Sequence, residues 1–339
     1  MIVKGSCSGL WSIIVKLPRR KFLHLAIDTI ALMLVSPLAW AQIYPSRPVR
    51  IIVGFAPGGT SDISARLVGQ WLSERFDHQF VTENRTGAAG NIAAEYVVNA
   101  APDGYTLLVF ASAAAVNATL YTNLNFDFIR DIAPVAGILR VPNVILANPS
   151  FPPETVPELI AYAKSNPGKI NMATAGIGST PHIFGELFKK MAGVNLLPVH
   201  YRGGGPALTD LLAGQVQVMF DPVGEAIGYV KSGKLRALAV TSATRLAALP
   251  DIPTVGEFVP GYEASGWSGM GAPKNTPVDI IDALNREINA GLVDPKMNAR
   301  LTDLGSTPLA LSPGDFRKLI ADEVNKWAEV IKFADIKAE

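Results

Sequence analysis

Three side chains in this sequence have the types that nucleophilic catalysis requires. Ser179 and His182 lie three residues apart at the start of a predicted helix, where a hydrogen bond between them is geometrically feasible, and Asp221 could orient the imidazole. Serine and histidine at a helix start are, however, commonly capping or polar lining groups, and no G-x-S-x-G elbow presents the serine. A serine hydrolase is therefore an alternative and not the leading interpretation.

Other patterns of catalytic sites are missing from the sequence. It contains no G-x-x-x-x-G-K-[ST] loop and no H-E-x-x-H helix, and the turn Gly54–Gly59 lacks the G-x-G-x-x-G spacing of a dinucleotide site. His78, His182 and His200 do not form a group of ligands at the spacing of a transition-metal site. We therefore predict no cofactor, no metal and no enzymatic activity.

A strand, a glycine-rich turn and a helix start follow one another repeatedly. In the first copy the strand Val49–Val53 leads into the turn Phe55-Ala56-Pro57-Gly58-Gly59, and a helical period begins near Ser61. In the second copy the turn Thr174–Thr180 precedes a helix that starts at Pro181. Glycines allow close approach of the backbone, and a helix N-terminus offers unpaired N–H groups and a positive dipole end. Such a turn suits an anion.

A third variant joins the strand Leu196–Tyr201 to a helix from Pro206 through the turn Arg202-Gly203-Gly204-Gly205. An ordinary structural βα turn explains any one of these stretches well, so the repetition is what favours a binding role.

Asp62 has two interpretations. In the first, its carboxylate stabilises the helix N-terminus and accepts hydrogen bonds from backbone amides of the turn, although it would repel a carboxylate ligand beside it. Alternatively, it faces the cationic group of an amino acid ligand. The first interpretation is the simpler one.

Strands alternate with helices along the chain, which predicts an α/β fold with a mostly parallel, covered sheet. Ligands of such sheets lie beyond the carboxyl ends of the strands. Ser112 directly follows the strand Thr106–Ala111 and is a candidate ligand contact, although a connector of small residues explains it equally well. Asn143–Ala147 is another predicted strand, and four prolines in Pro149–Pro157 mark a domain crossing.

The first 41 residues have the features of a signal peptide. Four basic residues between Lys16 and Lys21 precede the apolar run Phe22–Trp40, and Ala39-Trp40-Ala41 is a small-residue cleavage site. A retained membrane anchor is the alternative, and Arg19-Arg20 also resembles a twin-arginine export signal. We expect export to the periplasm with cleavage near Ala41.

The composition excludes several classes of partner. Without residues 1–41 the chain carries 25 basic and 28 acidic residues, so the formal charge of +1 for all 339 residues is misleading. No basic excess and no cluster of Lys and Arg among aromatic residues supports nucleic-acid binding. The single cysteine, Cys7, lies in the signal segment, so the mature chain has no disulfide or thiol chemistry.

Six motifs together resemble the Bug-type (TctC) receptors of tripartite tricarboxylate transporters, and the resemblance covers essentially all of Tyr44–Lys332. They are Phe55-Ala56-Pro57-Gly58-Gly59-x-x-Asp62, Asn84-Arg85-x-Gly87-Ala88-x-Gly90-Asn91, Pro102-Asp103-Gly104-Tyr105-Thr106-Leu107-Leu108, Gly176-x-Gly178-Ser179-x-x-His182, Tyr201-Arg202-Gly203-Gly204-Gly205-Pro206-Ala207 and Gly266-Trp267-x-Gly269.

The resemblance implies a receptor with the two-lobed periplasmic binding protein type II fold and a hinge between the lobes. Lobe 1 would comprise 42–147 and 262–339, and lobe 2 would comprise 148–261. The two glycine loops would hold one carboxylate of a small mono-, di- or tricarboxylate, aromatic acid or amino acid. The receptor would be a monomer that delivers this ligand to integral-membrane transporter subunits. A ligand-binding component of a signalling system is a further alternative.

The ligand-binding residues that the turns and the resemblance indicate are Phe55, Pro57, Gly58, Gly59, Thr60, Asp62, Ser112, Ala175, Gly176, Gly178, Ser179, Thr180, His182, Tyr201, Gly203 and Asp221. Arg202 either points into the site, where it would favour a diacid, or is a solvated surface residue.

Overall fold

The computed structural model describes residues 44–121, 123–303 and 305–337. By its contacts the chain divides into the units Met1–Tyr44 and Pro45–Glu339, and every described strand and helix belongs to the second unit. The predicted signal peptide lies outside the described residues. Among those residues no helix combines the length and apolarity that a membrane crossing requires.

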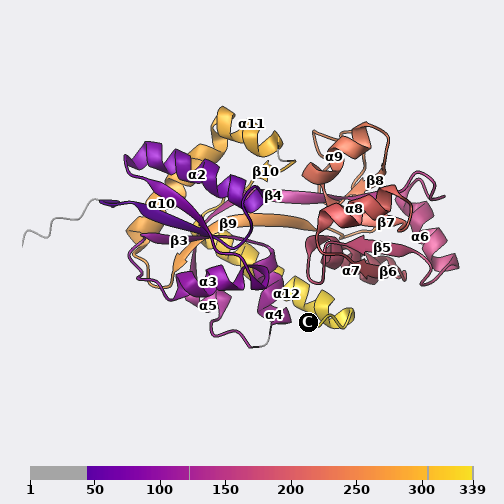
Figure 1. The fold of residues 1–339 in the computed structure, drawn as a ribbon, viewed down its shortest axis with the longest axis horizontal. Helices are drawn as coiled ribbons and strands as arrows, with labels where there is room; N and C mark the ends of the chain where they lie inside the picture. The colour runs from indigo at the N-terminus through magenta and orange to yellow at the C-terminus, as the bar shows by residue number, and fades with distance from the viewer. Residues whose placement is uncertain (1–43, 122, 304, 338–339) are drawn as a thin grey trace, which may run out of the picture. The chain divides into compact units, whose positions relative to one another are not determined.

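The second unit is an α/β fold, as the alternation of strands and helices predicted (Figure 1). Its strands are β1 (Val49–Val53), β2 (Phe80–Asn84), β3 (Thr106–Ala111), β4 (Ile132–Ala147), β5 (Asn171–Thr174), β6 (Leu197–His200), β7 (Val218–Pro222), β8 (Arg236–Val240), β9 (Ser265–Pro273) and β10 (Thr307–Pro308). Its α-helices are α2 (Thr60–Phe76), α3 (Asn91–Val98), α4 (Ala113–Leu120), α5 (Phe128–Asp131), α6 (Val156–Ser165), α7 (Thr180–Ala192), α8 (Gly204–Leu212), α9 (Val223–Lys231), α10 (Val278–Val293), α11 (Pro295–Asp303) and α12 (Pro313–Phe333), and the short 3₁₀ turns are η1 (Ala88–Gly90) and η2 (Val255–Glu257).

The strands form one hydrogen-bonded path in the order β2-β1-β3-β9-β4-β7-β5-β6, with β8 and β10 also paired to β4. Two groups of strands within it are parallel: β1 pairs with β2 and β3, and β5 pairs with β6 and β7. The long strands β4 and β9 pair antiparallel with each other and join the two groups. The glycine turns follow β1, β5 and β6, so they leave the carboxyl ends of parallel strands, as expected.

Strand β4 changes partners partway along its length. Its residues from Ile132 to Pro142 pair with β9, whereas those from Asn143 to Ala147 pair with β7. The predicted strand Asn143–Ala147 is only the last part of β4, and the strand begins at Ile132. Pro134 and Pro142 weaken the strand pattern, and the pairing with β9 shifts register next to Pro134 and again next to Gly137. The lobe boundaries at 147/148 and 261/262 stay a prediction.

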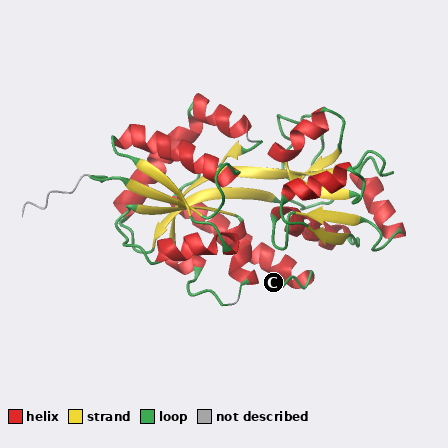
Figure 2. Ribbon diagram, in the orientation of Figure 1, coloured by secondary structure: helices red, strands yellow, loops and turns green. Residues whose placement is uncertain are grey.

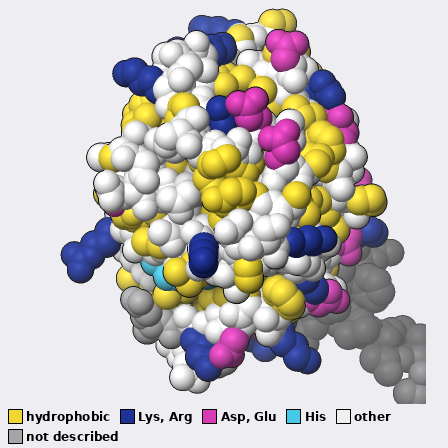
Figure 3. Space-filling model, turned by 90° about the vertical axis from the view of Figure 1, so that its right-hand side faces the viewer, with side chains coloured by type: hydrophobic (Ala, Val, Ile, Leu, Met, Phe, Trp, Pro, Cys, Tyr) yellow, Lys and Arg dark blue, Asp and Glu magenta, His cyan; other side chains and the backbone are white. Residues whose placement is uncertain are grey.

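Helices cover both sides of the strands (Figure 2). Helix α12 contacts α4, α7 and β4, and its Trp327 ring stacks on Phe184 of α7 at 5.3 Å between centroids. The indole N–H of Trp327 donates to Glu323 Oε2 at 2.7 Å, which satisfies a polar atom inside this apolar contact. On the face in Figure 3, the described Lys and Arg side chains are interspersed with Asp, Glu and apolar side chains.

Several predicted elements agree with the structure almost to the residue. The predicted strand Val49–Val53 is β1, and the predicted strand Thr106–Ala111 is β3. Helix α9 was not predicted, because Gly224 and Gly228 lower its helix propensity and its start coincides with the end of a strand.

Gly269 of β9 lies where a β-carbon would collide with the Phe316 ring and would lie 2.7 Å from the carbonyl oxygen of Ala136. We expect Gly269→Ala to lower the free energy of unfolding by about 1–3 kcal/mol, as overpacking does in well-packed cores. Urea denaturation measures this change. Gly228→Ala in α9 is the matched control, because its added methyl group would have no atom within 4 Å other than those of its own stretch of helix. A control that loses as much stability as Gly269→Ala would contradict the packing explanation.

Candidate functional site

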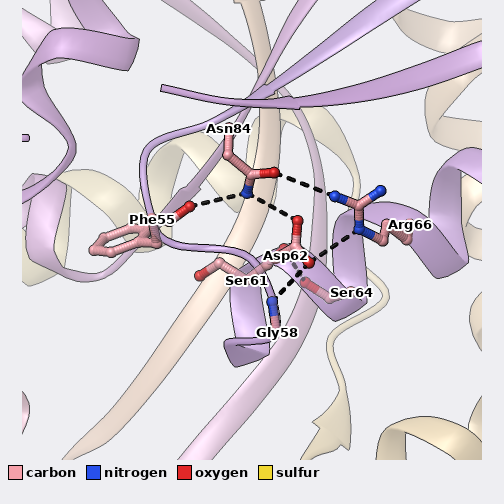
Figure 4. Close-up of polar contacts among 7 residues, drawn as sticks. All are labelled: Phe55, Gly58, Ser61, Asp62, Ser64, Arg66 and Asn84. Carbon is pink, nitrogen blue, oxygen red and sulfur yellow. Dashed lines mark hydrogen bonds and ion pairs between the residues drawn. The ribbon is translucent and has the colours of Figure 1, made fainter. Parts of the chain in front are cut away.

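The first glycine loop is held by a side chain of the helix that follows it. Gly58 adopts φ +84°, which favours glycine, and its N–H donates to Asp62 Oδ2 at 2.9 Å (Figure 4). Asn84, at the end of β2, donates from Nδ2 to Asp62 Oδ1 at 2.8 Å and to the carbonyl oxygen of Phe55 at 2.9 Å. The loop, the helix start and the neighbouring strand end are therefore fixed to one another.

The Asp62 carboxylate is buried and fully engaged. Burial opposes its ionisation, but hydrogen bonds from Arg66 Nε (3.0 Å), Gly58 and Asn84 outweigh burial and lower the pKa of Asp62 below its ordinary value. These contacts are those of the first interpretation of Asp62, in which the carboxylate holds amides of the turn. Arg66 was not singled out from the sequence, although its i, i+4 spacing from Asp62 is a detectable signal.

The second glycine loop has the same construction. Gly178 adopts φ +75°, and its N–H donates to His182 Nδ1 at 3.1 Å. In both loops the anchored glycine lies two residues before the first helical residue and the anchoring side chain lies two residues after it. The Ser179 hydroxyl donates to the carbonyl oxygen of Gly176 at 2.6 Å, which closes this loop further.

His182 is a neutral anchor. It is buried, and burial together with the nearby His200 and Lys189 lowers its pKa to about 4. Because Nδ1 accepts the Gly178 N–H, the ring proton of the neutral form is on Nε2, which lies 3.9 Å from Glu186 Oε1.

His200 adds a second, indirect support to this loop. Its Nδ1 lies 2.8 Å from Thr174 Oγ1, which also accepts a 3.4 Å hydrogen bond from the N–H of Gly176. Its ring contacts that of His182 edge to face, with 4.7 Å between centroids. Neither Thr174 nor His200 was predicted as part of the site, and only their places at strand ends could have indicated them.

The structure does not assemble the catalytic triad that the sequence left open. The Ser179 hydroxyl donates to a backbone carbonyl, and the Nδ1 atom of His182 is occupied by the Gly178 amide. Neither oxygen of Asp221 has a hydrogen-bond partner among the described residues, so this carboxyl does not orient the imidazole.

Both helices begin with an N–H group that is available to a ligand. The caps of α2 and α7, Gly59 and Ser179, make no side-chain capping hydrogen bond. Among the described residues nothing accepts a hydrogen bond from the backbone N–H of Thr60 or Thr180. Each free donor lies at the positive end of a helix dipole beside an anchored loop, which is an arrangement that binds anions.

The other predicted site residues lie at strand ends in two groups. Ser112 is buried after β3 and precedes α4, and a β-carbon on Gly178 would lie 3.1 Å from Leu120 Cδ2 of that helix, so the second loop and α4 are in contact. Tyr201 and Gly203 follow β6, and Asp221 lies near the end of β7; these two strands flank β5. The Tyr201 hydroxyl donates to Asp210 Oδ2 at 2.7 Å.

The two loops are not joined by any hydrogen bond or ion pair among the described residues. The first loop, with Pro57, Gly58 and Gly59, is exposed, whereas Ala175, Gly176 and the rest of the second loop are half-buried. Their joint action on one ligand stays a prediction.

We expect His182 to make the stability of the protein fall on acidification. Its pKa is about 4 in the fold and 6.5 in the unfolded chain, so the unfolded state binds more protons between these values. The free energy of unfolding therefore decreases by about 3 kcal/mol between pH 7 and pH 4 through this group alone. Urea denaturation at several pH values measures it.

His182→Asn is the comparison, because its amide oxygen can accept the Gly178 N–H and does not titrate. The difference in stability between the natural protein and this variant should shrink as the pH falls through this range. A difference that is independent of pH would contradict the assignment of His182 as a neutral acceptor.

Comparison with known proteins places this geometry in a family. Residues 64–336 match the family described as "Tripartite tricarboxylate transporter family receptor". Protein BugT of Bordetella pertussis is 36% identical over 295 residues, which is 86% of this chain and 90% of BugT. Among solved structures, Rpa4515 of R. palustris with adipate is 38% identical at a TM-score of 0.76, covering 87% of this chain and 99% of that one. The periplasmic binding protein BugD is 37% identical at a TM-score of 0.72, covering 87% and 100%. The chain thus belongs to the tripartite tricarboxylate transporter receptor family, and it is a solute-binding receptor of the periplasmic type rather than an enzyme.

Proposed function

We propose that this receptor captures a small carboxylate between the loops Phe55–Asp62 and Ala175–His182. The observation that carries the proposal is the matched pair of anchored loops, each of which leaves the first N–H of a helix, at Thr60 and at Thr180, without an acceptor among the described residues. One carboxylate has two oxygens, so each loop can donate to one of them. The adipate in the related Rpa4515 structure is a ligand of this chemical class.

The energy of such an arrangement is sufficient for a transport receptor. A hydrogen bond to a charged group contributes about 1.5–3 kcal/mol, and three to five of them reach roughly micromolar affinity after the cost of closure. The lobes 42–147 with 262–339 and 148–261 would close as a hinge, because only the closed state lets both loops contact the same ligand.

The proposed function also includes the export, the oligomeric state and the membrane partner of the receptor. The exported chain, cleaved near Ala41, would act as a periplasmic monomer and deliver its ligand to integral-membrane subunits of a tripartite transporter. The remaining site residues predicted from sequence would line the ligand around the two loops. Copurification of membrane subunits with the ligand-bound receptor would distinguish a permease partner from a signalling partner.

Removing one amide donor should weaken carboxylate binding. Thr60→Pro deletes the N–H at the first helical position, where proline is favoured, and Gly59 already has the extended conformation that precedes proline. We expect about a 10- to 150-fold loss of affinity for a bound diacid such as adipate, measured by calorimetry. Thr60→Ala keeps the N–H and should bind within a few-fold of the natural protein. Equal losses in both variants would show that the amide is not the donor.

A ligand of this class should also raise the thermal stability of the protein. At 100 times its dissociation constant a ligand adds about 2.7 kcal/mol to the free energy of unfolding. A screen of aliphatic, aromatic and amino-acid carboxylates by thermal shift tests this expectation. If no carboxylate in the panel stabilises the protein, the proposed function is wrong.

A further inference from the structure

Asp221 is a carboxyl group in the interior of the protein. Its side chain has no exposed surface, and neither Oδ1 nor Oδ2 accepts or donates a hydrogen bond among the described residues. A buried polar group that is left unpaired costs stability, so such a group in a binding protein requires an explanation. The two loop anchors, Asp62 and His182, are by contrast hydrogen-bonded.

The register of the strands places Asp221 beside the second glycine loop. Strands β5 and β7 run parallel with Ala173 opposite Met219, so the chain reaches Asp221 at the level of Ala175, where that loop begins. Neighbouring strands lie about 4.8 Å apart. The carboxyl is therefore on the same edge of the sheet as the loop that we propose to bind the ligand carboxylate.

A second acid lies next to Asp221. A β-carbon built on Gly204, the first residue of α8, would lie 2.8 Å from Glu225 Oε2 and 3.9 Å from Asp221 Oδ1, so both carboxyl groups face the same point of the backbone. Neither forms an ion pair in the described part of the chain, and Arg202, which precedes α8, forms none either. Asp210 of α8 is already bonded to the Tyr201 hydroxyl.

The electrostatics of this pair favour a cation. Burial, reinforced by the neighbouring Glu225, raises the pKa of Asp221 to about 8. An ammonium group would donate to the unpaired oxygens and stabilise the ionised carboxylate, so its binding would lower the pKa of Asp221 and release the proton.

We propose that Asp221, with Glu225 beside it, receives the ammonium group of a small amino-carboxylate whose carboxylate is held by the two glycine loops. This inference rests on the proposed function, because it takes the loops as the site of the carboxylate. It assigns to Asp221 the contact with a cationic ligand group that was the alternative interpretation of Asp62.

Matched ligands isolate the ammonium group. β-Alanine differs from succinate, and 4-aminobutyrate from glutarate, by an ammonium in place of one carboxylate, and L-aspartate and L-glutamate add an α-ammonium to the same diacids. Calorimetry with the purified protein at pH 7 should show at least one ammonium-bearing member binding ten times more tightly than its diacid, with release of a proton as Asp221 ionises.

Asp221→Asn should remove this preference. We expect it to weaken the ammonium-bearing ligand at least tenfold and to leave the diacid within a few-fold, and Glu225→Gln should act in the same direction with a smaller effect. Asp279→Asn, an exposed acid in the first turn of α10, is the control and should not change the preference. If Asp221→Asn does not fold, the ligand preference of Glu225→Gln and the proton release of the natural protein test the proposal instead.

Other outcomes would overturn the proposal. Tight binding of diacids alone, weakened by Asp221→Asn and without proton release, would show instead that a neutral Asp221 donates to a second carboxylate. An unchanged preference in folded Asp221→Asn would leave the carboxyls a role only at the N-termini of α8 and α9. In both cases carboxylates still bind and the proposed function stands, whereas a panel in which nothing binds would contradict that function itself.

Discussion

Each of the two glycine loops is fixed by a hydrogen bond from a backbone N–H to a side chain four residues further along the chain. Gly58 and Gly178 have positive φ angles that turn the backbone sharply, and Asp62 and His182 hold those turns against the first turn of the following helix. Since the anchor belongs to the helix itself, the loop cannot move without the helix start. The free N–H at the first helical position is consequently presented in one direction, which is the preorganisation that anion binding needs.

The two anchoring side chains, Asp62 and His182, hold their loops in different charge states. A carboxylate beside an anion site repels the ligand, so Asp62 requires Arg66 and Asn84 to compensate it. His182 needs no counter-ion, because burial keeps the imidazole neutral. Either way the anchor adds little net charge at the loop, and the attraction for an anion comes from amides and helix dipoles.

Most of the fold, but only part of the candidate site, could be predicted from the sequence. The strand, turn and helix around Gly58 were predictable because β-branched residues, glycines and a helical period follow one another without ambiguity. The first part of β4 was not predictable, since its prolines contradict a strand and only pairing with β9 overrides that signal. The spacing of Asp62 and His182 from their glycines was visible, but a spacing does not show that a side chain turns back to the loop. The pairing of His200 with Thr174 depends on β5 and β6 being neighbours, which is tertiary information.

The role of Asp221 depends on contacts that the sequence does not show. Its position at the end of a predicted strand was compatible with a triad or with a ligand contact. The structure argues against the triad, because a carboxyl group that has no hydrogen-bond partner among the described residues does not orient a histidine. The parallel strands β6, β5 and β7 deliver Tyr201, Ala175 and Asp221 to one edge of the sheet. Across that edge the protein offers amide donors at the second glycine loop and unpaired acceptors one strand away. A ligand that is negative at one end and positive at the other would satisfy both, as we propose.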